Sequence, residues 1–189
     1  MSTESDKEID PVLSAFRQGE LLVYATEAVM GIGCDPENES SVHRLCELKK
    51  RPVNKGVILI AATYSQLLKY VDDKAIPMDR RTEIFSSWPG PVTWLLPKSQ
   101  QAPAWITGEH PSIAVRVSAH QGVIDLCQRL DSPLVSTSAN LAGEEACRST
   151  AEAKQVFADE VIYIDGETGG NAAPSVIKDG VTGKVLRGG

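Results

Sequence analysis

The sequence predicts an α/β or α+β domain whose sheet contains strands of mixed direction. Short apolar, strand-like runs alternate with amphipathic helical segments along most of the chain. Turn residues then separate short strands near the C-terminus, as hairpins require. The chain has 189 residues, of which 42% are hydrophobic and 23% charged. We therefore expect one globular domain over residues 1–189, with residues 1–7 flexible.

Apolar spacing and turn residues predict each element in order. Helices are expected from Ile9 to near Gln18, at 40–51, at 64–71, around 84–85, at 123–130 and at 150–157. Ser40 or Ser41 caps the second helix, which stops at Pro52. Strands are expected at 21–24, 57–62, 92–96, 113–117, from Leu134, at 161–164, around 175–177 and at 185–186. The prolines at 89 and 91 break any helix, and residues 100–111 form a loop.

Composition excludes several classes of protein. A net charge of −6 and a pI near 5.1 argue against non-specific coating of nucleic acid, although a local basic patch is compatible with them. No apolar run approaches the roughly 20 residues of a membrane span, and residues 1–6 are unlike a signal peptide, so we expect a cytoplasmic protein. The four cysteines are scattered, which indicates neither a zinc site nor a disulfide framework.

Four cations fall within the seven residues 49–55, where a helix is expected to end and a buried strand to begin. Arg51 precedes a proline and is therefore pushed toward extended geometry. In extended chain, residues i and i+2 point the same way, so Lys49 and Arg51 are expected to converge on one phosphate. The alternative is a basic helix C-terminus that complements the macrodipole.

Polar residues also occur at strand ends. Thr26 and Glu27 follow the first strand, at a position where α/β proteins commonly place ligand-binding residues. Gly31 and Gly33 permit close backbone approach or positive φ there. A plain turn with a capping threonine is the alternative to a binding site. Arg116 interrupts an apolar strand, so it is either a structural ion-pair partner or a substrate clamp.

The segment 136–140 is a second polar row at a strand end. Ser136, Ser138 and Asn140 share a face if the chain stays extended, where they would bind phosphate or ribose oxygens. An N-cap or Asx-turn cluster is the alternative.

Familiar catalytic signatures are absent. The chain has no P-loop, no Gly-x-Gly-x-x-Gly after a strand and no Gly-x-Ser-x-Gly, and its three histidines lack a matching nucleophile motif. His43 is expected to pack or to face solvent. Phosphate-compatible donors without an evident general base suit phosphoryl or nucleotidyl transfer, in which positioning and charge neutralisation dominate.

Five motifs occur in the order and at about the spacing seen in the YrdC/Sua5/TsaC family. They are Lys49-x-Arg51-Pro52, Trp88-Pro89-Gly90-Pro91-Val92-Thr93, Ala114-Val115-Arg116, Ser136-Thr137-Ser138-Ala139-Asn140 and Pro174-Ser175. The chain resembles the short bacterial form of that family over Gly19 to Arg187. The resemblance implies a twisted open sheet with flanking helices and a concave, positively charged cavity.

The same resemblance implies a reaction and its partners. L-threonine, bicarbonate and ATP would give threonylcarbamoyl-AMP and pyrophosphate, with Mg²⁺ carried by ATP and no metal ligand from the protein. Transferase proteins would then place the threonylcarbamoyl group on tRNA beside the anticodon, while direct tRNA contact stays open.

Residue roles follow from matching positions in the family. The implied nucleotide-binding and catalytic residues are Lys49, Arg51, Ser138 and Asn140, with Arg187 near the nucleotide. The implied threonine-binding residues are Thr26, Arg116, Ser136 and Ser175. Ile60 stands where longer members have a histidine, so no role for that histidine carries over.

A non-catalytic protein that binds double-stranded RNA or assists ribosome assembly is the competing hypothesis. Both hypotheses use the cations at 49–51. Only the enzyme needs the polar row at 136–140 and a carboxylate clamp at Arg116.

Overall fold

A computed structural model describes residues 9–170 and 175–188, so the expectation for residues 1–7 lies outside the described part of the chain. The helices are α1 (Pro11–Arg17), α2 (Glu39–Leu48), α3 (Met78–Ser86), α4 (Ala104–Thr107), α5 (Gln121–Leu130) and α6 (Thr150–Phe157). The strands are β1 (Leu22–Ala25), β2 (Met30–Cys34), β3 (Ile58–Ala61), β4 (Val92–Pro97), β5 (Ser112–Val117), β6 (Leu134–Ser138), β7 (Ile162–Tyr163), β8 (Val176–Asp179) and β9 (Val185–Arg187).

The strands form one nine-stranded open sheet in the order β7-β1-β2-β6-β3-β5-β4-β8-β9. Three pairs are parallel, namely β1 with β7, β3 with β5 and β4 with β8. The other five pairs are antiparallel. This arrangement confirms the expected α/β fold with an open sheet of mixed direction.

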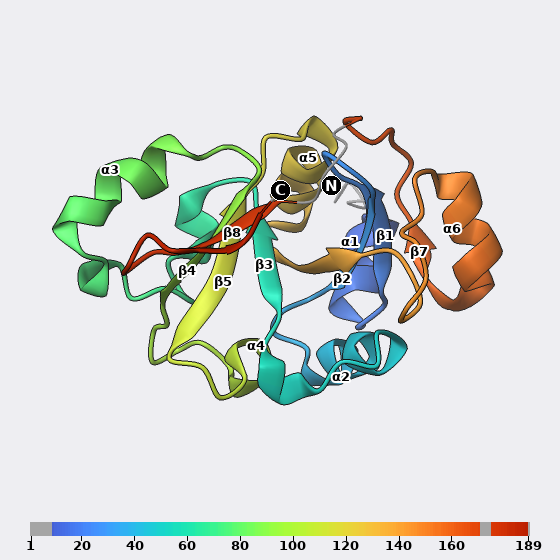
Figure 1. Ribbon diagram of the computed structural model, residues 1–189. Helices are drawn as coiled ribbons and strands as arrows, with labels where there is room; N and C mark the ends of the chain where they lie inside the picture. The colour runs from blue at the N-terminus through green and yellow to red at the C-terminus, as the bar shows by residue number, and fades with distance from the viewer. Residues whose placement is uncertain (1–8, 171–174, 189) are drawn as a thin grey trace, which may run out of the picture.

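Helices cover both faces of the sheet. On one face, Phe16 of α1 and the apolar side of α5 pack against Leu22, Ile60 and Leu134. On the other face, apolar residues of α2, α3, α4 and α6 pack against the opposite side of the same strands. Figure 1 shows α3 and α6 at opposite ends of the sheet, with α2 and α4 together below it.

The register leaves an opening between two central strands. β6 pairs with β2 as far as Ser138, but its pairing with β3 begins only at Ser136, opposite Ile58. The last two residues of β6, Thr137 and Ser138, thus extend beyond the start of β3. The corner that joins α2 to β3 reaches this opening, because Lys49 and Thr137 line the same cavity.

The expected extended geometry at 49–51 is wrong. Lys49 is helical at the C-cap and Lys50 is left-handed, with φ 46°. The Lys50 amide donates to Glu47 O and the Arg51 amide to Cys46 O, at 3.0 and 2.9 Å, which is a Schellman helix ending. The alternation of an extended chain therefore does not bring Lys49 and Arg51 together. The helix-ending turn places both side chains in the lining of one cavity.

Several local expectations also need correction. The Asn38 side chain caps α2 by accepting from the Ser41 amide, so neither Ser40 nor Ser41 is the cap. The expected helix at 64–71 is a 3₁₀ turn, Tyr64–Leu67, and the expected loop at 100–111 contains α4. Ile9 precedes the α1 cap and is 78% exposed, which places it outside that helix.

Candidate active site

Three adjoining cavities form one cleft along the sheet. The first is lined by Thr26, Arg116 and Ser175, among other residues. The second lies beside Lys55 and His110, and the third beside Lys49. All three cavities share two lining residues, Ile58 and Arg187. The cleft therefore brings together Lys49, Arg51, Thr26, Arg116, Ser136, Ser138, Ser175 and Arg187, all of them sequence-predicted site residues.

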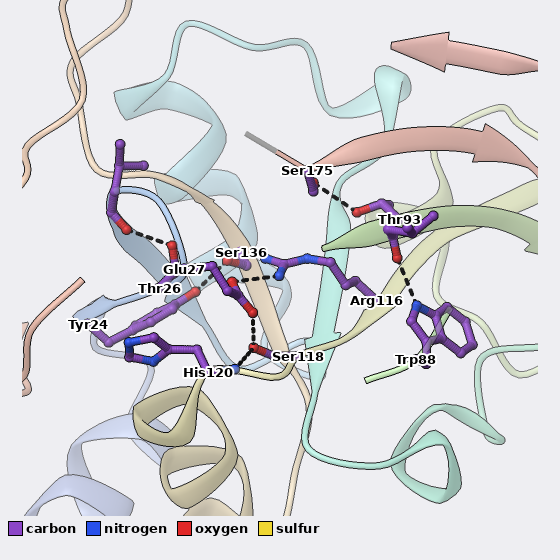
Figure 2. A network of polar contacts seen from close by, with 12 residues as sticks. Tyr24, Thr26, Glu27, Trp88, Thr93, Arg116, Ser118, His120, Ser136 and Ser175 are labelled. Carbon is purple, nitrogen blue, oxygen red and sulfur yellow. Dashed lines mark hydrogen bonds and ion pairs between the residues drawn. The ribbon is translucent and has the colours of Figure 1, made fainter. Parts of the chain in front are cut away.

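Arg116 of β5 is an ion-pair partner, and its side chain also lines the cleft. Its Nη1 lies 2.7 Å from Glu27 Oε2, and the two side chains are only 12% and 14% exposed. Its buried Nε has no hydrogen-bond partner within the described chain, although the side chain lines the cavity. Figure 2 shows the guanidinium reaching the Glu27 carboxylate. An ion pair thus holds the group and leaves it donors for a ligand.

Glu27 remains ionised next to this arginine. Burial opposes its charge, but the Arg116 cation and the hydrogen bonds from Ser118 and Arg116 outweigh burial, so the pKa of Glu27 lies below its ordinary value. The sequence marked Glu27 as a polar strand-end residue without a role. Its partner could not be read from the sequence because Arg116 lies 89 positions away.

Hydroxyl groups line the same end of the cleft. Thr26 Oγ1 donates to Val29 O at 2.6 Å, which leaves its lone pairs available to accept. Thr93 Oγ1 and Ser175 Oγ lie 3.2 Å apart (Figure 2). Sequence reasoning missed Thr93, which is fully buried; the signal was a lone polar side chain in an apolar strand.

Lys49 links the end of α2 to the segment after β6 at the other end of the cleft. Its Nζ donates to the backbone and side-chain oxygens of Ser138 and Asn140, at 2.5–3.4 Å. This contact, and not the helix macrodipole alone, explains the cation at the end of α2. Burial and the nearby Arg51 cation lower the pKa of Lys49 to about 8.

The polar row at 136–140 does not share one extended face. β6 ends at Ser138, and the Asn140 amide donates to the Ser138 carbonyl at 3.0 Å, which turns the chain. Asn140 Nδ2 donates to the Leu141 and Glu144 carbonyls, whereas in an Asx-turn its Oδ1 would accept from a backbone amide. Ser136 and Ser138 line the cleft, while Asn140 reaches it through Lys49.

Cations predominate in the cleft lining. Arg51 Nε donates to Gly56 O at 2.9 Å, and Arg187 Nη2 donates to Ser175 O at 3.0 Å. Burial and the charge of Arg116 lower the pKa of Arg187. Among the described lining residues the cations are Lys49, Arg51, Lys55, Arg116 and Arg187, and Glu27 is the one carboxylate.

Other sequence-based expectations have definite outcomes. His43 is exposed beside Glu39, as expected, and Ile60 is fully buried in the core under α5, away from the cleft. All four cysteines are free and buried. Within residues 9–170 and 175–188, no group of three His, Cys, Asp or Glu side chains could hold a metal ion. No helix in that part of the chain is long and apolar enough to span a membrane.

Sequence comparison relates nearly the whole chain to known proteins. A threonylcarbamoyl-AMP synthase of Pseudoalteromonas atlantica is 57% identical over 178 residues, which are 94% of this chain and 95% of that protein. The threonylcarbamoyl-AMP synthase of Klebsiella pneumoniae is 49% identical over 175 residues, 93% of this chain and 92% of that protein.

Solved structures give the same relationship. P. abyssi Sua5 complexed with L-threonine has a TM-score of 0.79 and 31% identity over 88% of this chain, which spans about half (49%) of that longer protein. E. coli YciO has a TM-score of 0.73 over 92% of this chain and 87% of its own; at 24% identity this likeness shows the fold alone. A family model described as telomere recombination, Sua5/YciO/YrdC, matches residues 14–189. This chain is therefore a member of the Sua5/YciO/YrdC family.

Proposed function

We propose that this protein is a threonylcarbamoyl-AMP synthase. It combines L-threonine, bicarbonate and ATP into threonylcarbamoyl-AMP, pyrophosphate and water. One observation carries the proposal: a largely buried arginine among hydroxyl groups adjoins a cluster of cations in a single cleft. The first arrangement suits an amino acid, and the second suits a polyphosphate.

Arg116 is the carboxylate clamp in this proposal. Its unpartnered Nε and its remaining donors can engage both carboxylate oxygens, a bidentate geometry that lysine cannot reproduce. Thr26 offers an acceptor to the substrate, because its own proton is already given to Val29. Ser136 and Ser175 complete the amino-acid end of the cleft.

Lys49, Arg51 and Arg187 neutralise the charge that develops around the phosphates. The amine of threonine takes up CO₂ as a carbamate, and a carbamate oxygen attacks the α-phosphorus of ATP while pyrophosphate leaves. Preorganised donors stabilise such a step, and removing one typically costs about 3 to 4 kcal/mol in the barrier. Ser138 and Asn140 hold the Lys49 ammonium in place within this group.

Mg²⁺ would enter with ATP. Glu27 is the one carboxylate among the described lining residues, and it is already paired with Arg116 and Ser118, which supports a metal ion carried by the nucleotide. When present, the ion would neutralise the phosphate oxygens that coordinate it.

The product would pass to tRNA-threonylcarbamoyl transferase proteins, and direct contact of this chain with tRNA stays a prediction. The competing RNA-binding hypothesis is not favoured. A protein that recognises double-stranded RNA by its shape contacts the backbone with exposed cations. Arg116 is largely buried and therefore does not suit that role.

The test measures pyrophosphate release from ATP with Mg²⁺, with and without threonine and bicarbonate. We expect release to require both, and we expect Lys49→Ala or Arg51→Ala to reduce it at least about a hundredfold. Lys50→Asn is the matched control, because it removes an exposed neighbouring cation and asparagine tolerates the left-handed backbone. Release that ignores threonine, or equal losses in all three variants, would contradict the proposal.

A further inference from the structure

Tyr24 reaches from β1 past β2 to a side chain of β6. The register places Tyr24 opposite Gly31 and Gly33 opposite Ser136, so all four lie on one face of the sheet. The Tyr24 hydroxyl donates to Ser136 Oγ at 2.6 Å (Figure 2). Neighbouring strands lie about 4.8 Å apart, so this contact bridges two strand spacings.

The two glycines of β2 make room for this tyrosine. A Cβ at Gly31 would lie 2.8 Å from the Tyr24 ring, and a Cβ at Gly33 would lie 2.9 Å from its hydroxyl. Neither glycine has a positive φ. Close approach, and not backbone conformation, is therefore what these positions require.

The hydrogen bond from Tyr24 makes Ser136 Oγ an acceptor within the protein and leaves the serine proton free. Tyr24 is 1% exposed, and burial raises its pKa, so its hydroxyl stays protonated and donates. A serine hydroxyl has one proton. Within the described residues Ser136 Oγ donates to no protein acceptor, and it lies on the wall of the cleft. Its proton is thus available to a ligand.

We propose that Tyr24 is a positioning residue that sets Ser136 as a hydrogen-bond donor to the carboxylate of the amino-acid substrate. The inference rests on the proposed function. An ionised carboxylate only accepts hydrogen bonds, so a serine with a free proton matches it. Arg116 and Ser136 line the same cavity, so the two donors can share one carboxylate there. Ser136 then contacts a group that every amino acid carries, and not the threonine hydroxyl.

Four variants test this inference: Tyr24→Phe, Ser136→Ala, their combination, and Tyr163→Phe. The control removes a tyrosine hydroxyl that donates to Ala158 O, away from the cleft. We expect Tyr24→Phe to raise KM for threonine about 3- to 10-fold, the range for one hydrogen bond, with kcat within about twofold. The threonine-to-serine preference should not change. The double variant should be no worse than Ser136→Ala, because Tyr24 acts through Ser136.

Additive losses in the double variant, or equal kinetics for the Tyr24 and Tyr163 variants, would overturn the inference alone. A wild-type protein without threonine-dependent pyrophosphate release would overturn both the proposed function and the inference. Proton NMR of the wild-type protein gives a check that needs no variant to fold. A buried Tyr24 hydroxyl resonance with a cross-peak to Ser136 supports the inference, and absence of that contact refutes it.

Discussion

Raising the pH above 8 should weaken ATP binding through a single side chain. The pKa of Lys49 is about 8, because it is partly buried and lies near Arg51. At pH 7 most of the protein carries the charged ammonium, whereas at pH 9 about one-tenth does. If ATP requires the ammonium, its affinity falls about tenfold over that interval. A charge-assisted hydrogen bond contributes about 1.5 to 3 kcal/mol, so residual ATP binding to neutral lysine limits the fall in affinity to between about sixfold and tenfold.

Calorimetric titration of ATP without threonine measures this dependence, because it excludes the amine of the second substrate. Near pH 9, binding should take up about 0.5 to 0.9 proton per ATP, visible as a heat that depends on the ionisation enthalpy of the buffer. Lys49→Arg should give a flat profile, since arginine stays charged. Lys50→Asn should follow the wild-type profile. Wild-type affinity that stays constant from pH 7.5 to 9.5 would refute the assignment of Lys49 to the phosphates.

Three further predictions concern stability and selectivity. Glu27→Gln should cost about 1.5 to 3 kcal/mol in the free energy of unfolding at pH 7, because it leaves Arg116 without its anion. Arg116→Lys should lower kcat/KM for threonine and serine by a similar factor, with serine a poor substrate and valine nearly inert in every variant. Gly33→Ala should cost more than about 2 kcal/mol, because its Cβ would lie 1.9 Å from Val135 O, whereas Gly166→Ala, with an ordinary contact, should be nearly neutral.

Each prediction has its own measurement. Urea denaturation at pH 7 and pH 3.5 tests the role of Glu27. The pKa of Glu27 is lower in the folded state than the 4.5 of the unfolded state, so its ionisation stabilises the fold fully above pH 4.5. That stabilisation is lost as the pH falls through the pKa of the folded state. A wild-type advantage that persists unchanged at low pH would contradict the ion pair. Steady-state kinetics test Arg116, and a strong change in the threonine-to-serine ratio would exclude the clamp. Thermal melts of the two glycine variants test the packing argument.

Apolar periodicity was enough to predict most of the elements but not their arrangement. α6 occurs at the expected residues, since its cap and apolar spacing are local. The corner after α2 was mispredicted, because its helix ending has Lys50 at the left-handed position where glycine is the usual signal. The preference of a residue before proline for extended geometry concerns Arg51 alone, whereas the helix ending determines the backbone at Lys49 and Lys50.

The candidate site was recognisable from side-chain chemistry, while its internal contacts were not. A lone arginine and a row of small polar residues in strand-like runs mark Arg116 and Ser136 as special. The contact of Lys49 with Asn140 joins residues 91 positions apart, and no local pattern encodes it. Tyr24 was predicted only as the last residue of a strand, because its hydroxyl partner lies two strands away.

The central position of β6 has a consequence for how the cleft is acquired during folding. β2 and β3 both pair with β6, which lies far from either in the sequence. β6 follows β2 by about a hundred residues and β3 by about seventy-five. Closing such long loops is entropically costly and slows folding. Until β6 inserts, the inner edges of β2 and β3 are open strands that can pair with other chains. We therefore expect ligand-binding ability to appear late and in one step, together with formation of the central sheet.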